Sequence, residues 1–242
     1  MTEQGEVRYG TTVIPYKVSR SARRKKTIEL TLDTLEGVLV AAPMKATPEQ
    51  IQAVVSKRAS WIVQRSVDGL MMPRPKAFVT GESLPYVGRE VRMEVSSADV
   101  PRVHIRFSHW AFTVTVPDGM DGEERCIAIR SAFVRWYRRR ARERISQSIA
   151  RWSPIVGVAP TAVKIRDQRQ RWGSCAPDGT LRFNLRIAMA DSWLLDYVVV
   201  HELCHLTQRS HSRQFWAGVE KAMPDYNSRR LMLREVGPRL VL

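Results

Sequence analysis

Cysteine is scarce in this sequence, with three residues in a chain of 242. An odd and sparse set cannot form the disulfide framework of a small secreted scaffold, so we expect a reducing compartment. The chain has no run of about 18 apolar residues, and its first residues show no basic stretch followed by an apolar one. These absences predict a cytoplasmic protein with no membrane partner.

Acidic residues are few beside basic ones, 24 against 39, which gives a net charge of +15. Such an excess favours acidic partners. Five cations lie between residues 20 and 26, and seven arginines lie between residues 135 and 151. Because consecutive arginines wrap around a helix, some of them must pair with protein carboxylates or face partners. The two runs are compatible with nonspecific nucleic-acid binding, although we favour a solvated cationic face.

No internal repeat and no low-complexity tract is visible. Alternating runs predict a hairpin from residues 27–33 and 38–42, with its turn at 34–37, and further strands follow around 91–116. Thr47 can cap one helix that extends to about residue 68, and Met71–Pro75 is typical of a linker. We therefore expect an N-terminal β-rich domain over residues 1–120.

The second domain is expected over residues 121–242. A long helix is predicted over about 122–152, with a catalytic core over about 153–242. Within the core we expect strands at 163–166 and 181–184 and a helix from residue 191 or 192. The inner residues expected of the long helix are Ile127, Phe133, Val134, Trp136, Tyr137 and Ile145.

The segment that carries chemistry is His201-Glu202-Leu203-Cys204-His205. Two histidines four residues apart project from one face of a helix, about one turn from each other. Two neutral imidazoles at that spacing can chelate one zinc ion. Glu202 then approaches the open side of the metal, where it can move a proton from water to the leaving amine.

A catalytic zinc needs a third protein ligand, and two residues can supply it. His211 lies six residues after His205, so the helix must end around residues 206–209, with Ser210 or Ser212 capping the next one. Glu220, on that following helix, is the alternative. We favour His211. Cys175 and Cys204 are a weaker possibility as ligands, because a cysteine on an apolar helix is more often a small buried residue.

The motifs around this segment resemble the YgjP-like zinc metallopeptidases, which are relatives of the SprT-type proteases. The resemblance covers nearly the whole chain and is most specific over its last 80 or so residues. It is carried by the metal segment and by Arg171-Trp172-Gly173-Ser174-Cys175, Asp196-Tyr197-Val198-Val199, Trp136-Tyr137-Arg138, His211-Ser212-x-x-Phe215-Trp216 and Pro224-Asp225-Tyr226.

The resemblance implies an α+β fold: a β-rich N-terminal region with a helix, then a long helix and a small zincin-like catalytic domain. It implies His201, His205 and His211 as ligands of one catalytic Zn²⁺, with Glu202 as general acid and base. The partner would be a protein or peptide substrate.

An edge strand beside the zinc can bind extended substrate through main-chain hydrogen bonds. We expect that edge to be Gly173–Cys175 or the returning strand Leu181–Asn184. Gly173 permits close backbone approach. The substrate-binding residues predicted are therefore Gly173, Ser174, Cys175 and Asn184.

Two other functions remain open at this stage. A metal-dependent phosphoanhydride hydrolase would use the arginines to hold phosphate, but the chain has no Gly-rich phosphate loop. A nucleic-acid-associated protein, with accessory protease activity or with a purely structural zinc, is the other possibility. A structural zinc site would not need Glu202 and usually uses cysteines.

Overall fold

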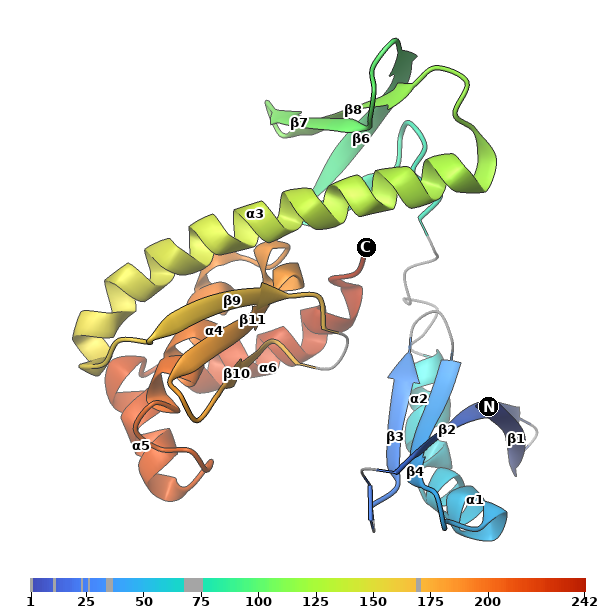
Figure 1. Ribbon diagram of the computed structural model, residues 1–242. Coiled ribbons are helices and arrows are strands. Elements are labelled where there is room, and N and C mark those ends of the chain that lie inside the picture. Colours follow the sequence, from blue (N-terminus) through green and yellow to red (C-terminus); the bar gives the residue numbers. More distant parts are fainter. Residues whose placement is uncertain are drawn as a thin grey trace. The chain divides into compact units, whose positions relative to one another are not determined.

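The computed structural model describes residues 2–10, 12–22, 24–25, 27–33, 37–67, 76–168 and 171–242 (Figure 1). They form two compact units, Met1–Pro75 and Lys76–Leu242. Separate sheets and helices give the expected α+β fold. The expected division at residue 120 falls inside the second unit, because the sheet before it packs on the helix after it. The predicted linker at Met71–Pro75 lies outside the described residues.

The first unit contains a four-stranded sheet in the order β1-β2-β4-β3. Its strands are β1 (Thr2–Tyr9), β2 (Thr12–Ser21), β3 (Glu29–Asp33) and β4 (Gly37–Pro43). Strands β2 and β4 are parallel, and the other neighbours are antiparallel. The pairing of β3 with β4 confirms the predicted hairpin, although residues 34–36 of its turn lie outside the described part of the chain.

Two helices follow where one was expected, α1 (Pro48–Lys57) and α2 (Ala59–Val67). Thr47 caps α1 as predicted, with Gln50 completing a capping box. The break comes at Arg58, whose amide donates to the carbonyl of Val55, three residues back, at 3.0 Å. That tight turn ends one helix and starts the next. The core of the unit includes Val18, Val40, Ile51, Val55 and Ile62.

The second unit opens with a sheet of the same topology, β5-β6-β8-β7. Its strands are β5 (Ser83–Tyr86), β6 (Arg89–Ala98), β7 (His104–Ser108) and β8 (Ala111–Pro117). Here too the two middle strands, β6 and β8, are parallel and the outer pairs are antiparallel. The same four-strand arrangement thus occurs twice, each time followed by a helix, although no repeat is visible in the sequence.

The long helix α3 (Gly122–Val156) joins this sheet to the C-terminal core (Figure 1). Aromatic rings pack them together: Phe112 of β8 lies edge-on to Phe133 and Trp136, with centroids 5.1 and 5.0 Å apart. The helix ends later than expected, at Gly157, which adopts a left-handed conformation with φ of 80°. Among the described residues, no helix combines the length and apolar character that a membrane crossing requires.

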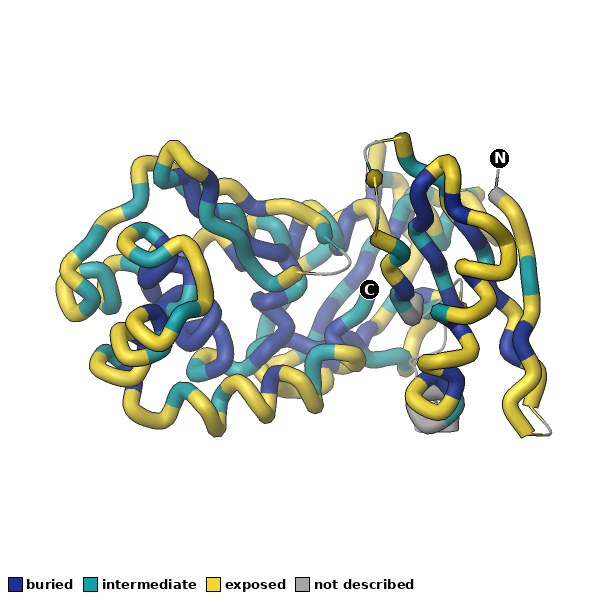
Figure 2. Tube along the Cα trace, turned by 90° about the horizontal axis from the view of Figure 1, so that it is seen from below, coloured by how far each residue is buried: buried dark blue, intermediate teal, exposed yellow. Residues whose placement is uncertain are grey.

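One of the predicted inner residues of α3 is wrong. Ile127 is 58% exposed, because it lies about 200° around the helix from Ile129, which is fully buried in the same turn. Buried residues alternate with less buried ones along β2 and β8, and they recur every three or four residues along most of α3; Figure 2 shows burial along the whole trace. Tyr137 is fully buried, and its hydroxyl donates to the carbonyl of Pro85 at 2.7 Å.

The C-terminal core is a small three-stranded sheet with helices. Its sheet has the order β10-β11-β9, with β10 at the edge and β11 in the centre. The turn at residues 177–180 joins β10 to β11, as predicted. The elements are β9 (Ala162–Arg166), β10 (Gly173–Cys175), β11 (Thr180–Asn184), η2 (Leu185–Ala188), α4 (Ser192–Cys204), α5 (Arg213–Ala222), α6 (Tyr226–Val236) and η3 (Gly237–Arg239).

Candidate metal centre

Helix α4, which carries the histidine motif, is buried on nearly all sides. Its residues from Leu194 to Val200 are apolar except for Asp196, and each of them is buried. A helix that is apolar all round belongs in a core rather than on a surface. Asp191 caps its first turn by accepting from the amide of Trp193 at 3.4 Å. The packing therefore holds α4 within the core, and the histidines lie at its C-terminal end.

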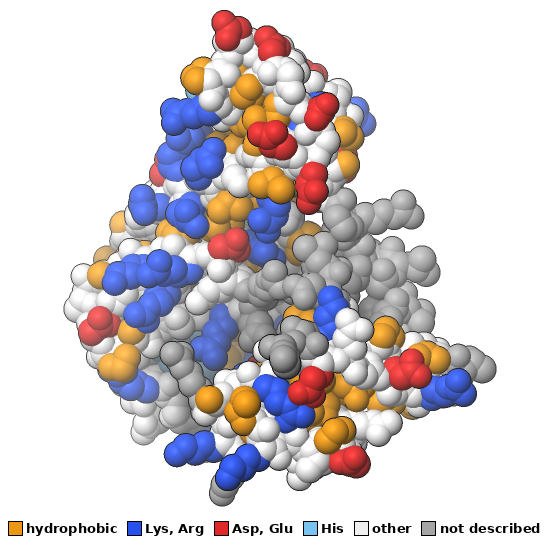
Figure 3. Space-filling view, turned by 45° about the vertical axis from the view of Figure 1, so that its right-hand side comes forward, with side chains coloured by type: hydrophobic (Ala, Val, Ile, Leu, Met, Phe, Trp, Pro, Cys, Tyr) orange, Lys and Arg blue, Asp and Glu red, His pale blue; other side chains and the backbone are white. Residues whose placement is uncertain are grey.

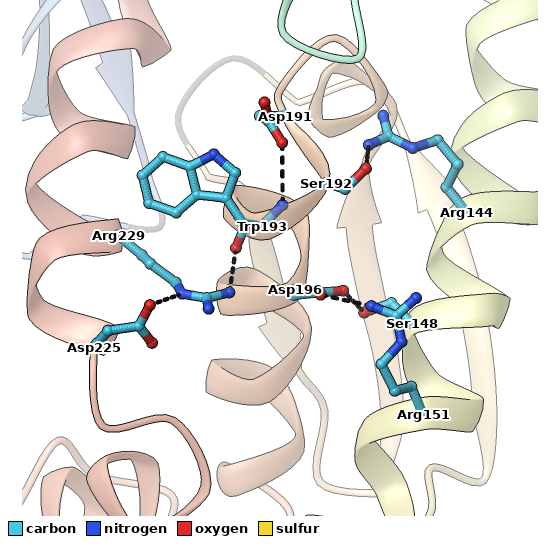
Figure 4. Close-up of polar contacts among 9 residues, drawn as sticks. All are labelled: Arg144, Ser148, Arg151, Asp191, Ser192, Trp193, Asp196, Asp225 and Arg229. Carbon is cyan, nitrogen blue, oxygen red and sulfur yellow. Dashed lines mark hydrogen bonds and ion pairs between the residues drawn. The ribbon is translucent and has the colours of Figure 1, made fainter.

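The one buried acidic residue in the middle of α4 is paired across to α3 (Figure 4). Asp196 accepts from the hydroxyl of Ser148 at 2.6 Å and from Arg151 at 2.9 Å. A buried carboxylate is costly unless such donors satisfy it. This pair of contacts holds α4 at one rotation and one height against α3.

Two further arginines join α4 to its neighbours (Figure 4). Arg144 of α3 donates to the carbonyls of Ala188 and Ala190 and to the hydroxyl of Ser192, at 2.6 to 3.3 Å. Arg229 of α6 donates to the carbonyl of Trp193 at 2.9 Å. These contacts secure the start of α4.

Three imidazole nitrogens converge at the other end of α4. The Nε2 atoms of His201 and His205 are 3.2 Å apart, and the Nε2 atom of His211 lies 3.0 and 3.2 Å from them. The helix ends at Cys204, slightly before the expected residues 206–209, and Ser212, one of the two expected caps, caps α5. The reversal between the two helices brings His211 back to the motif. Glu220, the alternative third ligand, is exposed on α5 and is not part of this cluster.

The cluster has the dimensions of a zinc site. Protein zinc lies about 2.0–2.1 Å from histidine nitrogen, and tetrahedral geometry then separates two such nitrogens by about 3.3 Å. The three separations agree with that value to within a few tenths of an ångström. Three neutral nitrogen donors also leave a fourth position for water or substrate, as catalytic zinc requires. The residues present therefore fit the ion.

Neighbouring groups orient the imidazoles. The Nδ1 atom of His205 lies 2.9 Å from the carbonyl of Gln208; since a carbonyl only accepts, Nδ1 carries the proton and Nε2 keeps its lone pair. The buried ring of Phe215 stacks on His205, with centroids 4.4 Å apart, and lies edge-on to His201 and His211 at 5.0 and 4.9 Å. Trp216 lies 5.8 Å from the ring of His201.

Burial keeps the first histidine neutral. Desolvation, with smaller contributions from the charges of His205, His211 and Arg230, lowers the pKa of His201 to about 3. Desolvation also lowers the pKa of His211, with a contribution from His205 and Arg230. Neutral imidazole is the form that binds metal, so the site is prepared for an ion near neutral pH.

Glu202 is buried beside this cluster with one oxygen unpaired. Its residue is 4% exposed, and its Oε2 atom has no hydrogen-bond partner among the described residues. Burial raises the pKa of its carboxyl to about 8, and the positive charge of Arg171 opposes that shift. An unpaired buried carboxyl oxygen is free to take and return a proton.

The strand β10 forms the wall opposite the motif. A cleft of about 300 Å³ is lined by Gly173, Ser174 and Cys175 together with the three histidines and Glu202. Of the two strands expected at the edge, β10 is the edge strand and β11 the central one. The structure thus brings three of the four predicted substrate-binding residues to the cleft.

Asn184, the fourth, is not among the residues that line this cleft. It is buried at the end of β11, where its amide donates to the carbonyls of Gln168 and Arg171 at 2.6 and 3.0 Å. Its side-chain oxygen accepts from the amide of Arg186 at 3.1 Å. In the structure Asn184 therefore positions the segment that leads into β10.

The cysteines behave as packing residues. Cys204 is buried, and burial raises the pKa of its thiol to about 11, so the thiol is neutral at ordinary pH. The half-buried Cys175 also has a raised pKa because of burial. Neither cysteine belongs to the cluster of potential metal ligands found among the described residues, which is the three histidines. Tyr226 stacks on Trp216 with centroids 5.4 Å apart, which is a packing role.

Part of each basic run is structural. In the first run, Arg20 forms an ion pair with Glu3 at 2.8 Å, while Arg23 and Lys26 lie outside the described residues. In the second, Arg140 pairs with Glu143 at 2.8 Å. As predicted, several arginines thus serve the fold. Lys and Arg side chains are nevertheless spread over much of the face in Figure 3, and nucleic-acid binding stays a prediction.

Comparison with known families decides what this centre belongs to. The family model described as YgjP-like, metallopeptidase domain, matches residues 26–236. The chain belongs to the YgjP-like metallopeptidase family. It is therefore a metal-dependent peptidase, and its substrates are proteins or peptides. The family favours peptide hydrolysis over the nucleotide-hydrolase and non-enzymatic alternatives.

Solved structures similar to this YgjP-like chain include two archaeal metallopeptidase zymogens. Pyrococcus abyssi abylysin is 21% identical, with a TM-score of 0.35, and the match covers 38% of this chain and 95% of that one. Methanocaldococcus jannaschii jannalysin is 19% identical, with a TM-score of 0.34 and coverage of 38% and 94%. No curated protein matches the chain.

Several residues around the centre have no local sequence signal. Phe215 stood in a motif without an assigned role, and its contact with all three imidazoles follows only from the turn before α5. Arg230 of α6 lies 4.7 Å from the ring centroid of Trp216 and follows His201 by almost thirty residues. Arg171 stood in a motif without an assigned role.

Proposed function

We propose that this YgjP-like chain cleaves peptide bonds with one zinc ion held by His201, His205 and His211, and with Glu202 as general acid and base. The observation that carries the proposal is the convergence of three Nε2 atoms beside a buried, unpaired carboxyl oxygen. Zinc in such a site supplies Lewis acidity, lowering the pKa of water to about 7 and polarising a carbonyl.

The protein's own residues divide the remaining work. Glu202 accepts the proton of the attacking water at Oε2, holds it within the buried site, and delivers it to the nitrogen of the departing amine. Phe215 and the carbonyl of Gln208 keep the imidazoles in the orientation that presents their Nε2 atoms. The apolar surroundings of α4 limit the access of bulk water, which strengthens each of these interactions.

The edge strand β10 is proposed to bind the substrate backbone. Gly173, Ser174 and Cys175 pair with β11 on one side, and no described strand pairs with their other side. That free edge lines the cleft, so an extended peptide can add to it through main-chain hydrogen bonds. Peptides methylated on backbone nitrogens should be cleaved less efficiently than their parents. Equal rates would contradict this binding mode.

The catalytic role is tested by Glu202→Gln in the zinc-loaded chain. The amide cannot accept the proton, so the variant should retain zinc and lose about 100- to 10,000-fold in turnover of a cleaved peptide. Zinc content is measured by atomic emission and turnover by the release of new amino groups.

Glu220→Gln is the matched control, because it makes the same change at an exposed position on α5. It should keep both zinc and activity. Loss of zinc in this variant would instead assign Glu220 as the third ligand. Retention of activity in Glu202→Gln would contradict the acid–base role.

A further inference from the structure

A second cavity, of about 290 Å³, adjoins the histidine cluster's cleft and shares Arg171, Gly173, His201 and Glu202 with it. Its lining includes His201 and Glu202, so it opens directly beside the reacting groups. Three arginines also line it: Arg171, which precedes β10, and Arg230 and Arg234 of α6. We call this cavity the arginine pocket.

The positive charge of the arginine pocket is not balanced by the protein. Arg171, Arg230 and Arg234 are all exposed, and none has a carboxylate within ion-pair distance among the described residues. Glu202 is the only acidic residue in the lining. Three like charges around one small cavity repel one another, and an anion bound there removes that repulsion.

Contacts with the protein restrain two of these three exposed arginines. Arg230 lies over the ring of Trp216, 4.7 Å from its centroid. Arg234 follows it by four residues, so both project from the same face of α6. The carbonyl of Arg171 accepts from the buried amide of Asn184 at 3.0 Å, which fixes the backbone that carries this side chain.

Apolar side chains form the rest of the wall. Val198 and Leu233 are buried, and Trp172 is half-buried. An apolar wall with cations at the mouth suits a short aliphatic stem that ends in a carboxylate. The guanidinium group binds carboxylate through paired N–H donors, which makes arginine selective for this group.

We propose that the arginine pocket binds a carboxylate of the substrate next to the bond that is cut, carried by an acidic side chain or by the free chain end. The proposal rests on the proposed function, because it assigns the substrate class of that same site. A nucleic acid fits less well, because the ring of Trp216 beside Arg230 is already stacked on Tyr226 and is not free to stack on a base.

The test measures peptide binding without turnover. The probes are fluorescein-labelled alanine hexapeptides with a single Glu, Gln or Lys at each position in turn, each made as the free acid and as the C-terminal amide. Fluorescence anisotropy gives their affinity for the zinc-loaded full chain carrying Glu202→Gln. One position of Glu, or the free chain end, should raise affinity about tenfold over the matching Gln or amide peptide. Which of the two does so identifies the source of the carboxylate.

Pocket variants in the same background assign the effect. Arg171→Gln with Arg230→Gln should abolish the preference, and Arg230→Glu should shift it toward the Lys peptides. Arg142→Gln, which removes a charge from an exposed position on α3, should leave it unchanged. Equal affinity for Glu, Gln and amide peptides would overturn the proposal, as would a preference that survives in the pocket variants.

Two further measurements separate this proposal from the proposed function. Wild-type, zinc-loaded chain that cleaves unfolded casein without binding acidic peptides preferentially would overturn the carboxylate pocket and leave the peptidase mechanism standing. Selective binding of acidic peptides without cleavage of any peptide would leave the carboxylate pocket standing and overturn the peptidase mechanism. Displacement of the Glu peptide by a single-stranded oligonucleotide that depends on Arg171 and Arg230 would overturn the assignment in favour of nucleic acid.

Discussion

The backbone of Gly173 approaches the carboxyl group of Glu202 so closely that no side chain fits between them. A Cβ atom at position 173 would lie 2.6 Å from both Cγ and Oε1 of Glu202. The glycine is therefore explained by the space it leaves, since its φ is not in the left-handed region. The backbone of the edge strand therefore packs directly against the carboxyl group of the proposed acid–base residue.

Gly173→Ala should reduce activity while leaving the fold intact. The added methyl group must displace the carboxyl of Glu202, and a displacement of about 1 Å can cost on the order of 100-fold in rate. The measurement is kcat/KM on a cleaved peptide, with zinc content and thermal melting determined in parallel. Gly218→Ala is the control, because a Cβ at that position of α5 meets nothing within 4 Å. Full activity in Gly173→Ala would contradict the close fit.

Ser148→Ala should destabilise the second unit. The hydroxyl of Ser148, which is 2% exposed, donates to Asp196 at 2.6 Å, and hydrogen bonds to charged groups contribute about 1.5–3 kcal/mol. The free energy of unfolding in urea should fall by that amount. Ser146→Ala removes a hydroxyl from an exposed position of the same helix and should change little. Equal stabilities for the two variants would show that Arg151 alone satisfies Asp196.

The metal-free chain should lose stability as the pH rises, because of Glu202. Burial raises the pKa of its carboxyl from 4.5 to about 8 in the folded state. The folded state therefore favours the protonated form, and this contribution is fully present below pH 4.5 and lost as the pH rises through about 8.

Thermal melting of metal-free wild type and Glu202→Gln between pH 5 and pH 9 measures this effect. The variant does not titrate at this position, so the Tm of the variant should rise relative to that of wild type as the pH increases. Glu220→Gln, with its exposed side chain, should run parallel to wild type. A difference in Tm between Glu202→Gln and wild type that stays constant with pH would show that folding does not raise the pKa of the Glu202 carboxyl.

The histidine motif was predictable from sequence because its chemistry is local. The spacing of His201 and His205 depends only on the pitch of a helix, and the buried strands and capped helices follow from short-range patterns. The position of His211 was predictable to the extent that the helix had to end before it. The family resemblance, confirmed over residues 26–236, then supplied the catalytic context.

The surroundings of the motif were not predictable because they depend on distant packing. The carbonyl of Gln208 meets His205 only through the conformation of one turn. Arg230 and Arg234 reach the cavity because α6 packs against α4. Ile127 was assigned to the buried stripe of α3 but lies on the face opposite to Ile129, which is the residue that the core buries in that turn. The repeated sheet topology likewise survives in the backbone without a matching sequence period.

Crystals of the full chain measured on both sides of the zinc absorption edge test the metal centre most directly. The structure predicts one anomalous peak, about 2.0–2.1 Å from the Nε2 atoms of His201, His205 and His211, that vanishes below the edge. A peak bound instead by Glu220 or a cysteine, or a chain that cannot be loaded with zinc, would contradict the proposed centre.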